Sequence, residues 1–266
     1  MAAMSSGVRI PLSPLKNHRH KGIVMQYPDC IFCGGDTKNA TIEHIWPESL
    51  GGTEEVCMRN KLVCEKCNNY FGSNIERQAL NDYPFLHYRF SSCITTKRGK
   101  YPKIKTRIGD FISSPFERII GLNPRSEEIE RRINNGHITQ FRILAEITDP
   151  YAICRFLLKM GLEIIADDRP YEIYNSKYDA ARRVARSPKL GDKWWFLFIR
   201  DDMSWLSNEL PVSKGIIELS TSIIEGHEMF CLKTNCFSFI TPIEQEFIPD
   251  PSLRRMDNYY VYEIVF

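Results

Sequence analysis

The chain has 266 residues, of which 43% are hydrophobic and 26% are charged. This length suits one large domain or two small ones, and this composition supports a sizeable buried core. The formal net charge of +2 excludes a strongly basic chain, so any contact with nucleic acid must come from a local patch of charge.

The sequence shows no sign of a membrane or secretory segment. No apolar run reaches the length of a membrane span, and the N-terminus has neither the apolar core nor the cleavage site of a secretory signal. We therefore expect a cytoplasmic protein without a membrane partner. The chain has nine cysteines, and four of them form two Cys-x-x-Cys pairs. In a reducing compartment this pattern favours a metal site over disulfide bonds.

Three ranges of the chain differ in character. Residues 1–28 are polar and basic, and they predict a flexible N-terminal arm. Residues 29–92 contain nearly all the side chains with recognisable chemistry. Residues 93–266 predict an α+β domain, and the sequence leaves open whether its role is DNA recognition, sensing or regulation.

The two cysteine pairs enclose a long insert. Cys30 and Cys33 form the first pair, and Cys64 and Cys67 form the second. Each pair can present two thiolates from one tight turn, and two such knuckles complete the tetrahedral shell of a Zn²⁺ ion. We therefore predict a structural zinc site that joins the two ends of the insert.

The insert and the residues after it carry polar groups suited to metal-dependent chemistry. Glu43 and His44 are neighbours, Asn60 precedes the second cysteine pair, and Asn68 and Asn69 follow it. Neighbouring side chains on a strand point to opposite faces. One of the Glu43 and His44 side chains can therefore bind a metal while the other acts on a water molecule.

A β-hairpin is predicted over residues 94–108, with its turn at residues 98–100. Its second half is basic, and Lys103, Lys105 and Arg107 alternate with uncharged residues, so they share one face of the strand. This face can follow a DNA backbone beside the metal. It can equally be an ordinary solvated face, and the sequence leaves both interpretations open.

The other predicted elements follow the periodicity of the side chains. Helices are predicted over residues 73–80, 126–133, 150–166 and 177–186. Strands are predicted over residues 194–199, 215–219, 229–232, 237–240 and 259–266. The expected fold class is therefore α+β.

The order of motifs in residues 30–80 resembles the HNH endonuclease family. It runs Cys-x-x-Cys, Glu-His-Ile-x-Pro, Gly-Gly, Asn, Cys-x-x-Cys and Asn, over about a fifth of the chain. The resemblance implies a ββα-metal (His-Me finger) nuclease module. In such a module a hairpin carries Glu43 and His44, Asn60 fixes a loop, and a helix begins near Asn68.

The resemblance also implies a role for each matching residue. His44 resembles the general base that takes a proton from the attacking water. Glu43 and Asn68 resemble ligands of the catalytic divalent ion, with Asn69 as the alternative to Asn68. Asn60 resembles the structural asparagine that holds the loop so that His44 is aimed correctly.

Two positions depart from the family pattern. Asn68 stands where the family often has histidine, and an amide oxygen suits Mg²⁺ or Mn²⁺ better than Zn²⁺. Phe71 replaces the basic residue often found three positions later, so the grip on phosphate must come from elsewhere.

We therefore expect a metal-dependent endonuclease that hydrolyses phosphodiester bonds of DNA, with a structural Zn²⁺ and a catalytic Mg²⁺ or Mn²⁺. A single HNH centre cuts one strand, so a monomer should nick DNA, while the oligomeric state is left open. Phage defence or restriction is the expected setting, and residues 93–266 leave room for a regulatory protein partner. Two alternatives are a catalytically silent zinc module that binds nucleic acid or protein, and a nuclease that acts on RNA.

Overall fold

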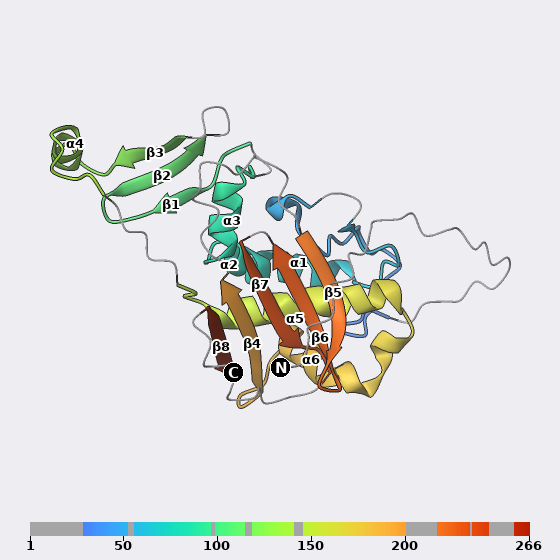
Figure 1. The fold of residues 1–266 in the computed structure, drawn as a ribbon. Coiled ribbons are helices and arrows are strands. Elements are labelled where there is room, and N and C mark those ends of the chain that lie inside the picture. Colours follow the sequence, from blue (N-terminus) through green and yellow to red (C-terminus); the bar gives the residue numbers. More distant parts are fainter. Residues whose placement is uncertain are drawn as a thin grey trace.

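A computed structural model of the chain describes residues 29–52, 56–96, 99–114, 119–140, 146–200, 217–234, 236–244 and 258–266. The predicted N-terminal arm, residues 1–28, lies outside these ranges. The described residues form helices and antiparallel sheets, which confirms the α+β class (Figure 1). None of the helices in these ranges combines the length and the apolar character that a membrane span needs.

A five-stranded antiparallel sheet is the largest element of the fold. Its strand order is β5-β6-β7-β4-β8. Each strand predicted between residues 194 and 266 overlaps one of these strands. Their bounds are β4 Lys193–Arg200, β5 Ile217–Ile224, β6 His227–Thr234, β7 Phe237–Pro242 and β8 Tyr259–Val265.

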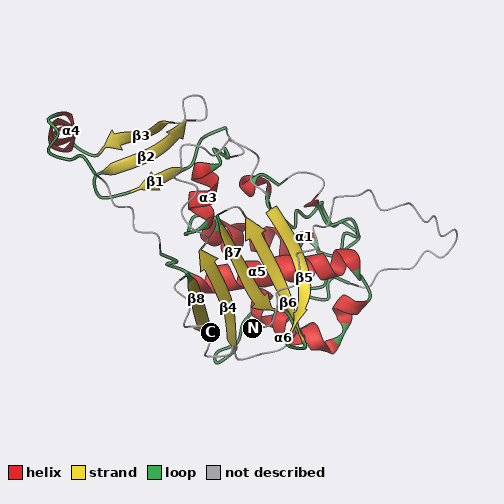
Figure 2. Ribbon diagram, in the orientation of Figure 1, coloured by secondary structure: helices red, strands yellow, loops and turns green. Residues whose placement is uncertain are grey.

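Helix α5, Pro150–Asp168, crosses one face of this sheet (Figure 2). The carboxylate of Asp149 accepts a hydrogen bond from the backbone N–H of Ala152 at 3.0 Å, and proline in the first turn suits a helix start. Gly161 faces the sheet, where an added Cβ would lie only 2.8 Å from the Cβ of Phe230. Glycine at this position therefore lets α5 approach the sheet closely. Helix α6, Asp179–Arg186, packs beside α5.

A second set of helical segments packs against α5 and, at its C-terminal end, against the sheet as well. Helix α1, Glu65–Tyr70, continues through the π-helical segment η3, Phe71–Glu76, into α2, Arg77–Ala79. Helix α3, Phe85–Ser91, follows after a short turn. The predicted helix 73–80 is thus the second half of a longer one that begins directly after Cys64.

The buried side chains of both predicted ranges form one hydrophobic core. The ring of Phe85 in α3 lies 5.3 Å from that of Phe156 in α5 and 5.6 Å from that of Phe239 in β7. The same cluster of buried residues extends from Cys30 to Ile264. The hydrophobic core therefore continues across residue 93. The division into two domains at this residue stays a prediction.

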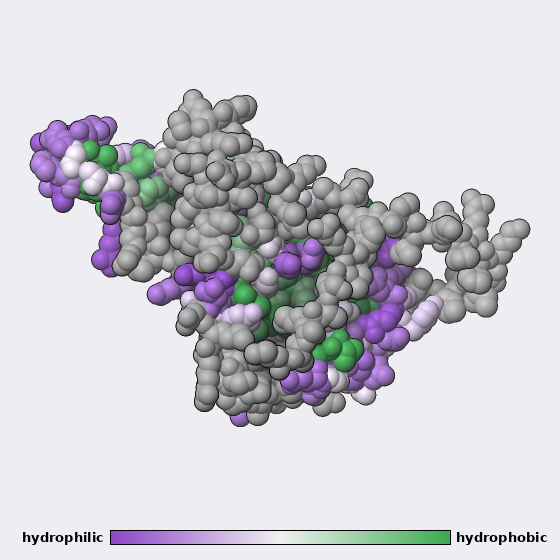
Figure 3. Space-filling view, in the orientation of Figure 1, coloured by the Kyte–Doolittle hydropathy of each residue, from purple (hydrophilic) through white to green (hydrophobic). Residues whose placement is uncertain are grey.

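A three-stranded sheet extends away from this body (Figure 1). It consists of β1 Lys103–Lys105, β2 Gly109–Ser114 and β3 Ile119–Pro124, followed by α4, Glu127–Asn134. We call these four elements the projecting sheet. The outer surface of α4 is hydrophilic (Figure 3), in keeping with a helix that has no buried residue.

The predicted hairpin over residues 94–108 is wrong in its pairing. Strand β1 pairs with β2, and the turn lies at Thr106, whose backbone N–H and hydroxyl both donate to the carbonyl of Gly109. Ile104 and Phe111 are partners in this register, and both are buried against Phe90 of α3. Burial of these three side chains selects β2 as the partner of β1.

Candidate active site and zinc site

The four knuckle cysteines converge on one point. The Sγ atoms of Cys30, Cys33, Cys64 and Cys67 all lie within 4.8 Å of one another, and those of Cys33 and Cys64 are 3.6 Å apart. Four sulfurs around a Zn²⁺ ion at about 2.3 Å stand roughly 3.8 Å apart. Within the described ranges this is the one group of three or more Cys, His, Asp or Glu with such spacing. The donor set and its size therefore fit zinc.

Local backbone hydrogen bonds shape both knuckles. The N–H of Cys30 donates to the carbonyl of Gly35 at 2.7 Å, which closes the first turn. The carbonyl of Cys64 accepts from the N–H groups of Cys67 and Asn68, both at 3.0 Å, and so begins α1. The second knuckle of the four-cysteine cluster therefore lies at the start of the helix that carries Asn68.

Helices α5 and α6 contribute to the surroundings of the zinc site. The Nε of Arg186 donates to the Sγ of Cys67 at 3.4 Å, and its guanidinium stacks on the ring of Tyr70 at 3.6 Å. The Tyr70 hydroxyl accepts from Arg155 at 2.7 Å. A cation beside a thiolate offsets part of the negative charge of a four-cysteine site. The Cys67 thiol also lowers the pKa of Cys30 to about 5 by hydrogen bonding to it.

Glu43 and His44 lie on a short antiparallel pairing. His44 forms a single β-bridge with Cys57. On either side of it, the N–H of Ile45 donates to the carbonyl of Val56 at 3.0 Å, and the N–H of Met58 donates to the carbonyl of Glu43 at 2.8 Å. The two segments therefore pair as in a β-hairpin, but over a single bridge.

A cavity of about 630 Å³ brings the predicted site residues together. Glu43, His44 and Asn68 all border it, although they come from two segments of the chain. Asn69 is exposed and is not among the residues that border it. The Nε2 of His44 lies 3.4 Å from the Oε1 of Glu48, which also borders the cavity.

Asn68 and Asn60 are held in different ways. The Nδ2 of Asn68 donates to the Oγ1 of Thr41 at 3.0 Å, which leaves its Oδ1 as the atom able to bind a metal. The Nδ2 of Asn60 donates to the carbonyls of Ala166 and Asp167, at 3.3 and 3.1 Å. Asn60 therefore lies outside the cavity and ties its loop to the C-terminal end of α5.

A buried lysine that the sequence analysis did not single out holds Glu43. The Nζ of Lys159 in α5 lies 2.6 Å from the Oε1 of Glu43, 3.0 Å from Glu76 and 2.9 Å from Glu163. Lys159 and Glu163 have no exposed surface. Burial by itself lowers the pKa of Lys159, but the carboxylates around it raise that pKa well above its ordinary value. Lys159 is therefore charged.

Negative charge exceeds positive charge in this cluster of Lys159 and its carboxylate partners. Three carboxylates surround one ammonium group, and burial raises the pKa of Glu163 well above its ordinary value. Even with Glu163 protonated, Glu43 and Glu76 outweigh Lys159. The Oε2 of Glu43 is buried and has no hydrogen-bond partner among the described residues. A divalent cation would supply the charge and the contact that this oxygen lacks among the described residues.

Removal of the Lys159 charge is expected to destabilise the fold strongly. In the Lys159→Met variant the buried Glu43 and Glu163 lose their cation, which typically costs about 3–5 kcal/mol. The Lys159→Met, Glu163→Gln double variant should recover part of this loss, because it also removes a buried carboxylate. Urea unfolding of the zinc-loaded proteins measures both changes. A single variant as stable as the wild type would contradict the charge balance described above.

The basic residues Lys103, Lys105 and Arg107 do not border the cavity. Lys103 and Lys105 are exposed on the same face of β1, with Ile104 buried between them. Arg107 lies beyond the end of β1 and is also exposed. Lys103 is 3.9 Å from the carboxylate of Asp110. Thr96, upstream of β1, borders the cavity. Contact of these side chains with DNA stays a prediction.

Comparison with known protein families matches residues 30–84 to the HNH endonuclease family. No curated protein and no solved structure matches the chain. The matched range contains both cysteine pairs and the predicted residues of the cavity, and it ends before α3 and α5. The resemblance inferred from the motifs is thus confirmed: residues 30–84 of this chain match the HNH endonuclease family.

Proposed function

We propose that this protein is a metal-dependent endonuclease of the HNH type that hydrolyses phosphodiester bonds of DNA. The family match indicates a nuclease in general. The observation that carries the proposal is the cavity bordered by Glu43, His44 and Asn68, where a buried carboxylate oxygen of Glu43 has no partner among the described residues. The short pairing at His44, followed by helix α1, supports a ββα-metal arrangement.

His44 acts as the general base in this proposal. Glu48 can accept the Nε2 proton of His44, which leaves Nδ1 free of a proton and able to take one from a water molecule. The ring also presents 25% of its side-chain surface to solvent, so that water can reach it. Glu48 therefore positions the base, and His44 moves the proton.

The Oε2 of Glu43 and the Oδ1 of Asn68 are the atoms that would hold the divalent ion. When bound, such an ion neutralises charge on the phosphate and on the leaving oxygen. Two oxygen ligands from the protein suit Mg²⁺ or Mn²⁺, which keep several waters in their coordination shell. Lys159 holds the other oxygen of Glu43 and so keeps Oε2 on the side of the cavity.

Supercoiled plasmid is the substrate that tests the proposed function. Zinc-loaded protein with Mg²⁺ or Mn²⁺ should convert it first to the open-circular form, because one such centre cuts one strand, and EDTA should stop the reaction. Binding without cleavage under all these conditions would favour the silent zinc module. Cleavage of a labelled RNA but not of the plasmid would favour the RNA nuclease.

We also propose that β1 of the projecting sheet contacts the DNA backbone. Changing Lys103, Lys105 and Arg107 together to glutamine should weaken binding to all sequences alike. It should also flatten the log–log dependence of affinity on salt by roughly 2 to 3 units, because each lost phosphate contact removes a little under one. Binding titrations at several salt concentrations measure this slope. A slope equal to that of the wild type would assign the three residues to a solvated face.

Phage defence or restriction in the cytoplasm, with a regulatory protein partner, is the setting that we propose for such a nuclease. Plating of phages on cells that carry the wild type or the His44→Ala variant tests this setting. Equal numbers of plaques on the two strains, across a broad phage panel, would argue against it.

A further inference from the structure

Arg89 borders the same cavity from helix α3, outside the range that matches the HNH family. Its side chain is almost fully buried, with an exposed fraction of 7%. Its Nη1 donates one long hydrogen bond, 3.4 Å, to the carbonyl of Leu80. Its Nε is buried and has no hydrogen-bond partner in the part of the chain that the structure describes. Most of the donors of this guanidinium are therefore unused.

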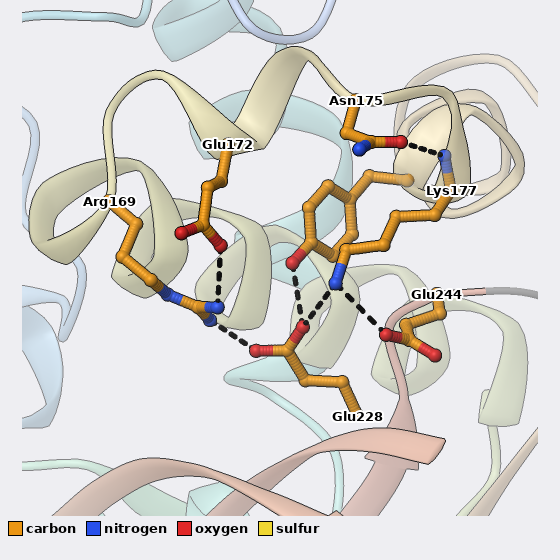
Figure 4. Close-up of polar contacts among 7 residues, drawn as sticks. Arg169, Glu172, Asn175, Lys177, Glu228 and Glu244 are labelled. Carbon is orange, nitrogen blue, oxygen red and sulfur yellow. Dashed lines mark hydrogen bonds and ion pairs between the residues drawn. The ribbon is translucent and has the colours of Figure 1, made fainter. Parts of the chain in front are cut away.

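Arg89 also has no counter-ion among the described residues. None of the ion pairs within the described ranges includes it, and burial lowers its pKa with no carboxylate to offset the effect. Several other buried or half-buried cations have carboxylate partners, and the half-buried Arg155 donates instead to two backbone carbonyls and the Tyr70 hydroxyl. Figure 4 shows Arg169 and Lys177 paired with Glu228, and Lys159 has three carboxylates. Arg89 differs from these side chains, because it has one long hydrogen bond and no carboxylate partner among the described residues.

A structural role explains little of this arrangement. Arg89 lies in the last turn of α3, where a positive charge interacts favourably with the helix dipole. That interaction is weak at the end of so short a helix, and the bond to Leu80 is long. A buried charge without a partner is strongly unfavourable. A bound anion would pair with the Arg89 guanidinium and remove this cost.

We propose that Arg89 binds a phosphate of the nucleic-acid substrate in the cavity. This inference rests on the proposed function and adds to it a residue from outside the HNH motif. A guanidinium presents paired N–H donors that match two phosphate oxygens. Phe71 stands where a basic residue often grips phosphate in the family, and Arg89 supplies the missing positive charge from another helix.

The charges around the cavity agree with this assignment. Glu43 and Glu76 border it and carry the negative charge that suits a cation, whereas Arg89 and Arg77 border it and are positive. A phosphodiester held between a divalent ion and a guanidinium has its charge neutralised by both. Arg77 differs from Arg89 because it is exposed to solvent.

The Arg89→Met variant separates phosphate binding from a structural role. Methionine keeps an apolar stem of similar length and removes the unpaired charge. We expect its melting temperature and zinc content to equal or exceed those of the wild type, while cleavage of saturating plasmid falls on the order of 10²-fold. Arg89→Lys should recover part of the rate. Arg77→Met, which removes the same charge from an exposed position beside the same cavity, should lower the rate much less.

Inorganic phosphate provides a readout that does not depend on cleavage. The melting temperature of the wild type should rise with sodium phosphate more than with sodium chloride of equal ionic strength, and Arg89→Met should lose this difference. Equal responses of the two proteins to phosphate would overturn the inference. So would an Arg89→Met variant that melts far below the wild type yet cuts at the same rate per zinc-loaded molecule. If the wild type cuts no nucleic acid, the proposed function fails, while the phosphate response still decides the role of Arg89.

Discussion

The His44→Ala variant is expected to lose cleavage while it keeps its fold. Removal of a general base typically lowers a rate by about 10²–10⁴-fold. His44 is not part of the hydrophobic core, and its side chain is 25% exposed, so truncation leaves no buried cavity. The backbone pairing with Cys57 does not depend on the side chain. Zinc content and the urea midpoint should therefore match those of the wild type.

Single-turnover cleavage of plasmid over a range of Mn²⁺ concentrations distinguishes the base from the metal ligands. More Mn²⁺ should not restore the rate of His44→Ala, because the missing group is a proton acceptor. It should restore much of the rate of Asn68→Ala, because the missing group is a metal ligand. Asn69→Ala is the matched control, since Asn69 is exposed and does not border the cavity. Equal rates for wild type and His44→Ala would remove His44 from the mechanism.

The parts of the site that the sequence predicted are those fixed by local spacing. A Cys-x-x-Cys pair presents both sulfurs from a single turn, so each of the two knuckles follows from spacing alone, and the preference of zinc for four ligands predicts that they meet. The helices over residues 126–133 and 150–166 were predictable because the side-chain period of a helix is also local. The long-range partners of these elements carry no such local signal.

The surroundings of Lys159 and Arg89 could not be predicted from sequence patterns. Lys159 and Glu163 interrupt the apolar helix α5 one turn apart, and a polar pair inside a buried helix was the one available signal of an internal charge cluster. Nothing in the sequence indicated that Lys159 would meet Glu43, which lies far away in the chain. Arg89 is one arginine in a short helix, and only the three-dimensional structure shows that none of the described residues is its counter-ion.

The prediction of a hairpin over residues 94–108 was wrong for a related reason. Two turns compete in this stretch, one at Gly99 and one at Thr106, and each forms its own hydrogen bonds. Local preference cannot choose between them. The contact of Ile104 and Phe111 with Phe90 decides the pairing, and that contact is tertiary. Basic residues expected on one long strand are therefore divided between β1 and the bend after it.

Replacement of Cys64 by serine is expected to unfold the insert between the knuckles. Structural zinc contributes about 10–16 kcal/mol of apparent binding free energy in small zinc modules, which equals or exceeds the stability of a typical domain, about 5–15 kcal/mol. Cys64 also begins α1, the helix that positions Asn68. Loss of zinc should therefore remove the metal ligand and the fold of the insert together.

The five-stranded sheet should survive this change better than the insert. Its strands pair with one another, and α5 is packed closely against it at Gly161. Amide hydrogen exchange resolves the two regions, and we expect protection to fall over residues 30–84 and to persist in β4 and β6. Cys93→Ser is the matched control, because Cys93 is a half-buried cysteine outside the zinc cluster. Cleavage by a Cys64→Ser protein that contains no zinc would show that the four cysteines do not hold the active site together.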